Sequence, residues 1–167
     1  MANFDSKIKS LTGIDITDAT IQGYITDWLT EGAREVISSM PLPFLWAVAS
    51  ETAIVANTGL DVGTGKLLAV VGDTNELPAR EIPASLRYKA KTSGWIEEAT
   101  STDPAFYRYD GKVYLLPITI AGKALHVSFP AVLYSESAIS NFPDEYEYLV
   151  SLYGAVKSLQ YLLNQKN

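Results

Sequence analysis

The sequence has no cysteine and one histidine, His126, and these shortages exclude several kinds of chemistry. Without thiols the chain cannot form a disulfide, use a thiolate nucleophile or bind a metal through sulfur. With one histidine, no multi-histidine metal site can form within a subunit. We therefore predict no metal site and no cofactor.

Long apolar runs are missing as well. No run approaches the ~18 residues that a membrane-spanning helix needs, and the segment from Met1 to Gly13 lacks the apolar core of a signal peptide. We expect a soluble protein without a membrane partner. Basic residues are fewer than acidic ones, 13 against 19, which gives a net charge of −6. This balance argues against a surface built to bind nucleic-acid phosphates.

The segments that resemble catalytic motifs lack residues that those motifs need. The segment Asp61–Lys66 resembles a phosphate-binding loop, but Leu60 stands where that loop needs glycine, and Leu67 where it needs serine or threonine. We interpret it as a β-turn. His126 lies on the polar side of a predicted strand, without a nucleophile motif to partner it. We predict no catalytic residues and expect that the protein is not an enzyme.

The C-terminal part, 136–167, carries the strongest helix pattern. Asn141 and Pro143 are typical of a helix start, and the acidic residues after them suit its positive end. Apolar residues then follow at spacings of three and four, which predicts one apolar face: Leu149, Leu152, Val156, Leu159 and Leu163.

Beside this stripe lie the small residues Ser151, Gly154, Ala155 and Ser158. Small side chains let a second helix or a neighbouring subunit approach closely, so we assign these four to subunit packing. Because glycine costs a helix roughly 1 kcal/mol relative to alanine, a packing reason for Gly154 is plausible. The alternative is a surface helix that tolerates one glycine.

A second long helix is predicted in the N-terminal part, 1–43. Thr17 and Asp18 supply capping residues, and an apolar stripe follows from about Asp18 to Ser39, before Pro41 ends the helix. The stripe contains Ile21, Ile25, Trp28, Gly32 and Val36. We assign Trp28 and Gly32 to packing as well, Trp28 in the core or an interface.

The middle part, 44–135, has strand patterns separated by turns. The Asp110–Gly111 pair predicts a hairpin between Phe106–Tyr109 and Lys112–Ile118, and a second turn leads to a strand over Lys123–Phe129. The order of these three strands and their short turns predicts a meander. The predicted fold is therefore α+β: one domain, 1–167, in which two long packed helices flank a β-rich lobe of short antiparallel strands.

One local exception to the acidic character is the segment from Arg87 to Lys91. Its three cations fall at alternate positions, and so share one face if the segment is extended. We interpret them as a solvated strand face or a source of ion pairs between subunits. Contact with nucleic acid or an acidic partner is the alternative.

Residues in four stretches, in order along the chain, resemble those of head–tail connector proteins from tailed bacteriophages, also called adaptor or neck proteins. The stretches are Asp27–Ile37, Ala79–Pro83 with Leu86, Ala99–Tyr107 followed by Gly111–Pro117, and Asn141–Glu145. The resemblance covers nearly the full chain, although each stretch by itself is short.

The resemblance implies a structural virion protein at the head–tail junction, made in the host cytoplasm. Such a protein forms a homo-oligomeric ring, usually twelvefold, that binds the portal protein on one side and the tail or nozzle protein on the other. DNA passes through the lumen without specific binding, and an acidic wall suits that passage. We guess that Phe4–Ile16 and Gln160–Asn167 are docking arms.

Two other functions stay open. One is another structural part of a virion, such as a tail-completion or capsid-decorating protein. The other is a β-rich module that binds carbohydrate or peptide. That module would be a monomer with Trp95, Tyr107 and Tyr109 clustered on an exposed face.

Overall fold

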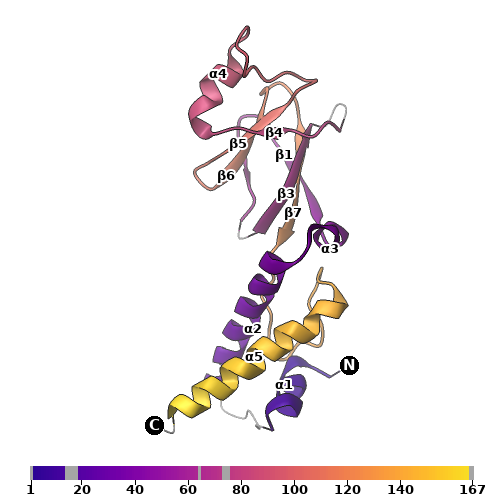
Figure 1. The fold of residues 1–167 in the computed structure, drawn as a ribbon, viewed down its shortest axis with the longest axis vertical. Coiled ribbons are helices and arrows are strands. Elements are labelled where there is room, and N and C mark those ends of the chain that lie inside the picture. Colours follow the sequence, from indigo (N-terminus) through magenta and orange to yellow (C-terminus); the bar gives the residue numbers. More distant parts are fainter. Residues whose placement is uncertain (1, 14–18, 64, 73–75, 166–167) are drawn as a thin grey trace. The chain divides into compact units, whose positions relative to one another are not determined.

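The structure is a computed structural model that describes residues 2–13, 19–63, 65–72 and 76–165 (Figure 1). The predicted cap, Thr17 and Asp18, lies outside these residues. The chain forms two compact units: unit 1 comprises Met1–Val48 and Phe129–Asn167, and unit 2 comprises Ala49–Ser128. Helices and largely antiparallel sheets are both present, so the predicted α+β class is confirmed.

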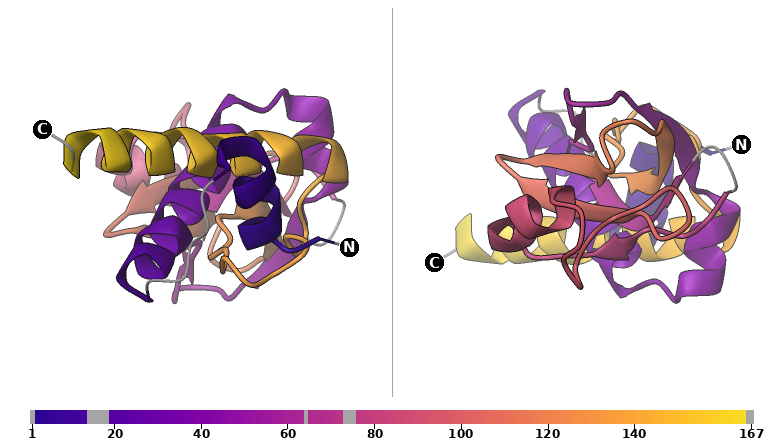
Figure 2. Two further views of the ribbon diagram at one scale, coloured as in Figure 1. Left: turned by 90° about the horizontal axis from the view of Figure 1, so that it is seen from below. Right: turned by 90° about the horizontal axis from the view of Figure 1, so that it is seen from above.

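Unit 1 is helical. The two long helices, α2 and α5, pack against each other as predicted, and the short helix α1 also packs against α5 (Figures 1 and 2). None of the described helices is long and apolar enough to cross a membrane. The helices are α1 (Phe4–Thr12), α2 (Ala19–Ser39), α3 (Leu42–Ala47) and α5 (Asp144–Gln165).

Helix α1 was not foreseen. Its start is capped by Asn3, whose Oδ1 accepts a hydrogen bond from the backbone N–H of Ser6 at 2.9 Å. Gly13 ends the helix with a φ of +72°, a conformation that glycine adopts without strain. Phe4 and Ile8 are completely buried. The guess of a detachable docking arm is therefore wrong for the described part of Phe4–Ile16, because α1 is built into the core of unit 1.

The boundary of the middle lobe also differs from the prediction. The residues from Phe44 to Ala47 belong to α3 instead of a strand, and Phe44 packs edge-on against Tyr146 with ring centroids 5.5 Å apart. Pro41 and Pro43 do not prevent this helix, because proline is tolerated in a first turn. The predicted lobe 44–135 therefore corresponds to unit 2 with both ends moved inward, to 49–128.

Unit 2 contains two sheets. One has the strand order β1-β7-β3, and the other has the order β2-β6-β5-β4. All pairs are antiparallel except β4 and β5, which run parallel. The strands are β1 (Ser50–Ile54), β2 (Leu60–Asp61), β3 (Gly65–Gly72), β4 (Arg80–Glu81), β5 (Ala105–Tyr109), β6 (Lys112–Leu116) and β7 (Gly122–Ser128).

The predicted hairpin is confirmed, but the meander is wrong. Asp110 and Gly111 both have positive φ and connect β5 to β6. The next strand, β7, leaves β6 and becomes the central strand of the other sheet, between β1 and β3. Gly122 permits this close pairing, because a Cβ there would lie 2.5 Å from the Val71 carbonyl oxygen and would also clash with the Leu115 side chain.

Two buried apolar clusters stabilise unit 2. The first gathers side chains from both sheets, and the second lies under the segment that precedes and includes α4 (Arg87–Lys91). The first cluster consists of Ile54, Val70, Phe106, Val113, Leu115 and Ala124; the second of Ile82, Ala90, Ala99, Ala105, Tyr107 and Leu116.

The segment from Arg87 to Lys91 is the helix α4, so the prediction of an extended face is wrong. A 3-10 turn, η1 (Ala84–Leu86), follows Pro83 and leads into the helix, which buries Ala90. In a helix, residues four apart share a face and residues two apart do not. Arg87 and Lys91 therefore lie on one side of α4, and Lys89 on another.

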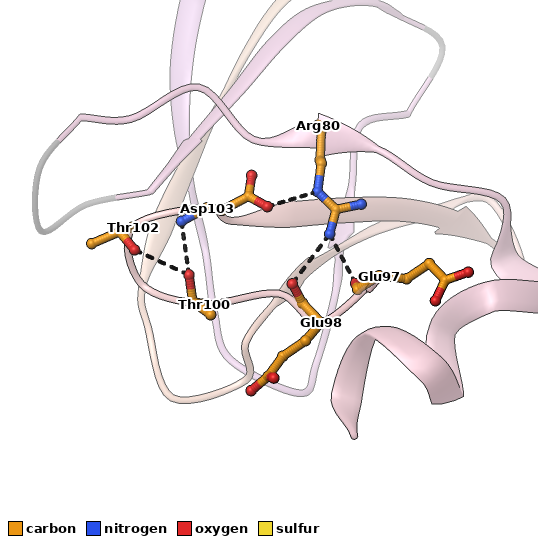
Figure 3. Close-up of polar contacts among 6 residues, drawn as sticks. All are labelled: Arg80, Glu97, Glu98, Thr100, Thr102 and Asp103. Carbon is orange, nitrogen blue, oxygen red and sulfur yellow. Dashed lines mark hydrogen bonds and ion pairs between the residues drawn. The ribbon is translucent and has the colours of Figure 1, made fainter. Parts of the chain in front are cut away.

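Arg80 fixes the long loop between α4 and β5 (Figure 3). Its Nε contacts Asp103 Oδ2 at 3.1 Å, and its Nη2 donates to the carbonyl oxygens of Glu97 at 2.8 Å and Glu98 at 3.3 Å. Thr100 Oγ1 accepts from the backbone N–H of Asp103 at 3.0 Å. These bonds hold the loop in one conformation without regular secondary structure.

Candidate functional site

The buried face of α5 consists mostly of small residues, with Val150 as its large apolar member and Glu147 near its start. Ser151, Ala155 and Ser158 are almost fully buried, and a Cβ on Gly154 would lie 3.1 Å from Leu29 Cδ2 and 3.2 Å from Ile8 Cδ1. The serine hydroxyls donate to carbonyl oxygens of their own helix, which satisfies them without a distant partner. The small face thus lets α1 and α2 approach α5 closely.

The six residues that we assigned to subunit packing therefore contact helices of the same chain. The four small residues of α5 are buried in the contact just described. A Cβ on Gly32 would lie 3.0 Å from Tyr153, and Trp28 packs beside Tyr161 with ring centroids 5.8 Å apart. Their role between subunits stays a prediction, and the structure shows a partner within unit 1.

The leucine stripe of α5 is exposed. Its five members, which form the predicted apolar face, have exposed fractions between 39 % and 64 %. We call Leu149, Leu152, Val156, Leu159 and Leu163 the α5 stripe. Its spacing of three and four residues is that of a helix–helix seam. The stripe is a continuous row of exposed apolar side chains on the described surface of unit 1, and therefore the leading candidate for an interaction site.

A groove runs beside the stripe between α2 and α5, and we call it the α2–α5 groove. It has a volume of about 410 Å³ and shares Leu149 with the stripe. Most of its lining is apolar or aromatic, and Glu35 is its one charged residue. The lining consists of Gly32, Glu35, Val36, Ser39, Met40, Pro41, Tyr146, Leu149 and Tyr153.

Glu147 is a buried carboxylate that the sequence reading treated only as a charge at the helix start. Its Oε1 accepts from the backbone N–H of Ile139 at 2.7 Å, and its Oε2 contacts Lys7 Nζ at 3.4 Å. Lys7 also donates to the carbonyl oxygen of Ser137 at 3.1 Å. Glu147 thus joins α1, α5 and the segment before α5, and so fixes the orientation in which the stripe faces outward.

Two tyrosines have perturbed ionisation. Burial raises the pKa of Tyr153, and a hydrogen bond with Glu31 raises it further. Burial likewise raises the pKa of Tyr107, whose ring stacks on Tyr114 with centroids 5.1 Å apart, while the positive charge of Arg87 opposes the shift. Tyr107 packs in the core of unit 2, and Tyr153 packs against Gly32 and bonds with Glu31.

Unit 2 exposes a second candidate surface around α4. The Arg87 guanidinium lies 4.9 Å from the ring centroid of Tyr109 and 5.1 Å from that of Tyr88, and the Lys89 ammonium lies 5.1 Å from the Trp95 ring. The three aromatic side chains are at least half exposed. The α4 patch consists of Arg87, Tyr88, Lys89, Lys91, Trp95, Ile96 and Tyr109.

The aromatic cluster expected of a carbohydrate or peptide module does not form as predicted. Trp95 and Tyr109 are exposed, but Tyr107 is buried in the core of unit 2. His126 lies on β7 beside Thr52 of β1. Its Nε2 lies 3.0 Å from Thr52 Oγ1, and among the described residues its buried Nδ1 has no hydrogen-bond partner. A hydroxyl of a β-strand threonine is an ordinary structural neighbour for it.

Two of the four stretches that resemble connector proteins meet in unit 2. Arg80 of the second stretch binds Asp103 of the third, and Arg80 and Glu81 pair with the start of β5. The two stretches therefore form one local structure, the loop that Arg80 holds in Figure 3. No protein-family model matches the chain, and no curated protein sequence matches it.

Proposed function

We propose that the protein is a structural, non-enzymatic subunit of a tailed-phage virion. In this proposal it is a head–tail adaptor that forms a ring between portal and tail, with DNA passing through the lumen. The observation that carries the proposal is the exposed α5 stripe, five apolar side chains on one face of a 22-residue helix.

Exposure of this stripe favours assembly for an energetic reason. Complete burial of an exposed leucine or valine side chain contributes about 1.5–3 kcal/mol, so five such side chains that are 39–64 % exposed leave part of that stabilisation to be gained on association. Single exposed apolar residues are common on monomers, whereas a continuous row of them marks an interaction surface. The spacing of the row suits a helix or helical groove of a neighbouring subunit.

The charge distribution supports a channel rather than a DNA-binding surface. Unit 1 contains ten acidic and five basic residues. On α2, Asp27, Glu31 and Glu35 recur at intervals of four and are exposed, which places three carboxylates in one row. Carboxylates repel phosphates, so a ring built from acidic subunits would not grip the DNA that passes through it.

The test is the mass of the purified protein, measured by light scattering and electron microscopy with and without a portal ring. We expect a ring, either alone or on the portal. The double variant Leu152→Glu, Leu159→Glu should stay monomeric with the helix content of the parent, because charge on the stripe cannot be buried between subunits. Val55→Glu, which changes an exposed apolar residue of unit 2, is the matched control and should assemble.

Two outcomes would overturn the proposal. The first is a parent protein that is monomeric and indifferent to the portal. The second is a stripe variant that assembles as the parent does, because the stripe would then have no part in the ring.

A further inference from the structure

The α4 patch combines free positive charge with exposed apolar area. Ile96 is 96 % exposed, and Trp95 beside it is half exposed. Within the described parts of the chain, Arg87, Lys89 and Lys91 have no carboxylate partner, whereas Arg108 of the same unit is paired with Glu81 at 3.0 Å. Arg87 and Lys89 instead lie over aromatic rings, and Lys91 is exposed, which leaves their charge available to a partner.

This combination fits a protein partner better than nucleic acid. Protein interfaces are enriched in aromatic residues and arginine, with an apolar centre and a polar rim. Acidic residues in the same segments, Glu97, Glu98 and Asp110, would repel a phosphate backbone. The partner should therefore offer an apolar hollow with carboxylates at its edge.

The α2–α5 groove of unit 1 has that chemistry. Val36, Met40 and Leu149 give it an apolar lining, and Glu35 lies at the groove. Glu35 continues the α2 row of Asp27 and Glu31, in which successive carboxylates are about 6 Å apart along the helix axis. Among the described residues Asp27 and Glu35 have no cation partner, and Glu31 is paired with Lys157 at 3.8 Å.

We propose that the α4 patch of one copy docks into the α2–α5 groove of a neighbouring copy. Trp95 and Ile96 enter the apolar lining, and the α4 cations face the α2 carboxylates. The inference rests on the proposed assembly and names the surfaces that make it. Because the two surfaces differ, the contact is head-to-tail, which is the kind of contact that closes into a ring.

The continuity of the surfaces agrees with this contact. Leu149 belongs to both the groove and the α5 stripe, so an element seated in the groove also covers the start of the stripe. The charges of the two units agree as well. Unit 1 has an excess of five acidic residues, and unit 2 has nine acidic residues and eight basic ones. A contact between unlike units is therefore less repulsive than one between two copies of unit 1.

Charge reversal and rescue test the contact. In sedimentation experiments on the full chain, we expect Arg87→Glu with Lys91→Glu to weaken association at least about tenfold. Adding Asp27→Lys and Glu35→Lys to the same chain should restore it, because every contact then pairs a reversed patch with a reversed groove. Lys123→Glu, at an exposed pair with Glu51 on the other sheet, is the control and should associate as the parent does.

Crosslinking gives a second readout that does not need a closed ring. Since the chain has no cysteine, Ile96→Cys and Val36→Cys introduce the only thiols. A thiol-specific crosslinker should give a ladder of covalent dimers, trimers and larger species from the double variant. Each single variant should give no ladder beyond a dimer.

The results of these experiments distinguish a failure of this contact from a failure of the proposed ring. If the parent forms a ring and the charge-reversed variant forms it equally well, the contact is wrong and the ring stands. If the parent never assembles on the portal but the ladder appears, the contact stands and the adaptor function fails. Two further results would overturn the contact. One is a crosslink that forms only within single chains. The other is the absence of any ladder together with binding of a duplex oligonucleotide that Arg87→Glu with Lys91→Glu abolishes.

Discussion

The two units differ in where their large apolar side chains lie. In unit 2, the valine, leucine and phenylalanine side chains of the paired strands fill two buried clusters. In unit 1, α5 turns its serine, glycine and alanine residues inward and its leucines outward. The strands of unit 2 thus bury apolar side chains among themselves, and exposed ones such as Trp95 and Ile96 lie near α4. In unit 1 the exposed stripe lies along a long helix and gives that unit a reason to associate.

The core of unit 1 shows how this reversal is possible. Helices α1 and α2 contribute large buried side chains, Phe4, Ile8, Ile25, Leu29 and Ile37, whereas the large apolar side chain that α5 buries completely is Val150. These side chains fill the space that the small face of α5 leaves open. Helix α5 is therefore held largely by its neighbours' side chains, and the apolar side chains of its stripe remain for other contacts.

The largest expected effect comes from filling the small face. Gly154→Leu should lower the free energy of unfolding of unit 1 by about 1–3 kcal/mol or more, because a Cβ there already lies 3.1 Å from Leu29 Cδ2. Urea unfolding gives the loss, and amide hydrogen exchange should place it in α2 and α5 while the strands of unit 2 keep their protection.

The matched control is the same substitution at an open glycine. A Cβ on Gly23 of α2 would meet nothing within 4 Å. Gly23→Leu should therefore stabilise unit 1 by up to about 1 kcal/mol through helix propensity alone. Equal effects of the two substitutions would show that the small face of α5 is not closely packed, and the comparison between the units would fail.

Much of this architecture could be predicted from the sequence. Both long helices have nearly the predicted bounds, because spacings of three and four between apolar residues identify a helix wherever it packs. The Asp110–Gly111 hairpin was equally clear, because few residue pairs adopt positive φ at both positions. These features depend on local backbone preferences, which a sequence displays directly.

The features that failed depend on tertiary contacts. Periodicity locates an apolar face on α5, but it does not say whether that face or the small one meets α2. The sheet that receives β7 depends on close pairing at Gly122, which no local pattern encodes. The cations of α4 alternate as in a strand, yet burial of Ala90 after the turn at Pro83 favours a helix there.

A somewhat smaller effect is expected at Glu147, which sets the orientation of α5. Glu147→Ala leaves the buried N–H of Ile139 without an acceptor and should cost unit 1 about 1–3 kcal/mol. Glu147→Gln keeps an acceptor for that N–H and should recover most of the loss, since the contact with Lys7 at 3.4 Å is long and partly exposed. An alanine variant as stable as the parent in urea would contradict this role.

The smallest expected effect is a loss of stability at alkaline pH, and it should appear in both units. Tyr153 in unit 1 and Tyr107 in unit 2 have pKa values above the ordinary value of 10.0, mainly through burial. Below pH 10 both tyrosines are protonated in the folded and the unfolded chain, so their contribution to stability is intact. Above pH 10 the unfolded chain loses these protons first, and stability falls as the pH rises toward the folded pKa values.

Tyr153→Phe separates the units in this titration, because it keeps the ring that packs against Gly32 and removes the hydroxyl that bonds with Glu31. The alkaline loss of protection should then shrink in α2 and α5 and persist around Tyr107 in β5, while tyrosinate absorbance shows one late-ionising tyrosine fewer. If the variant instead loses protection in unit 1 over the same pH range as the parent, ionisation of Tyr153 does not cause the alkaline loss of stability in that unit. Tyr153 would then differ from the exposed tyrosines only in the packing of its ring.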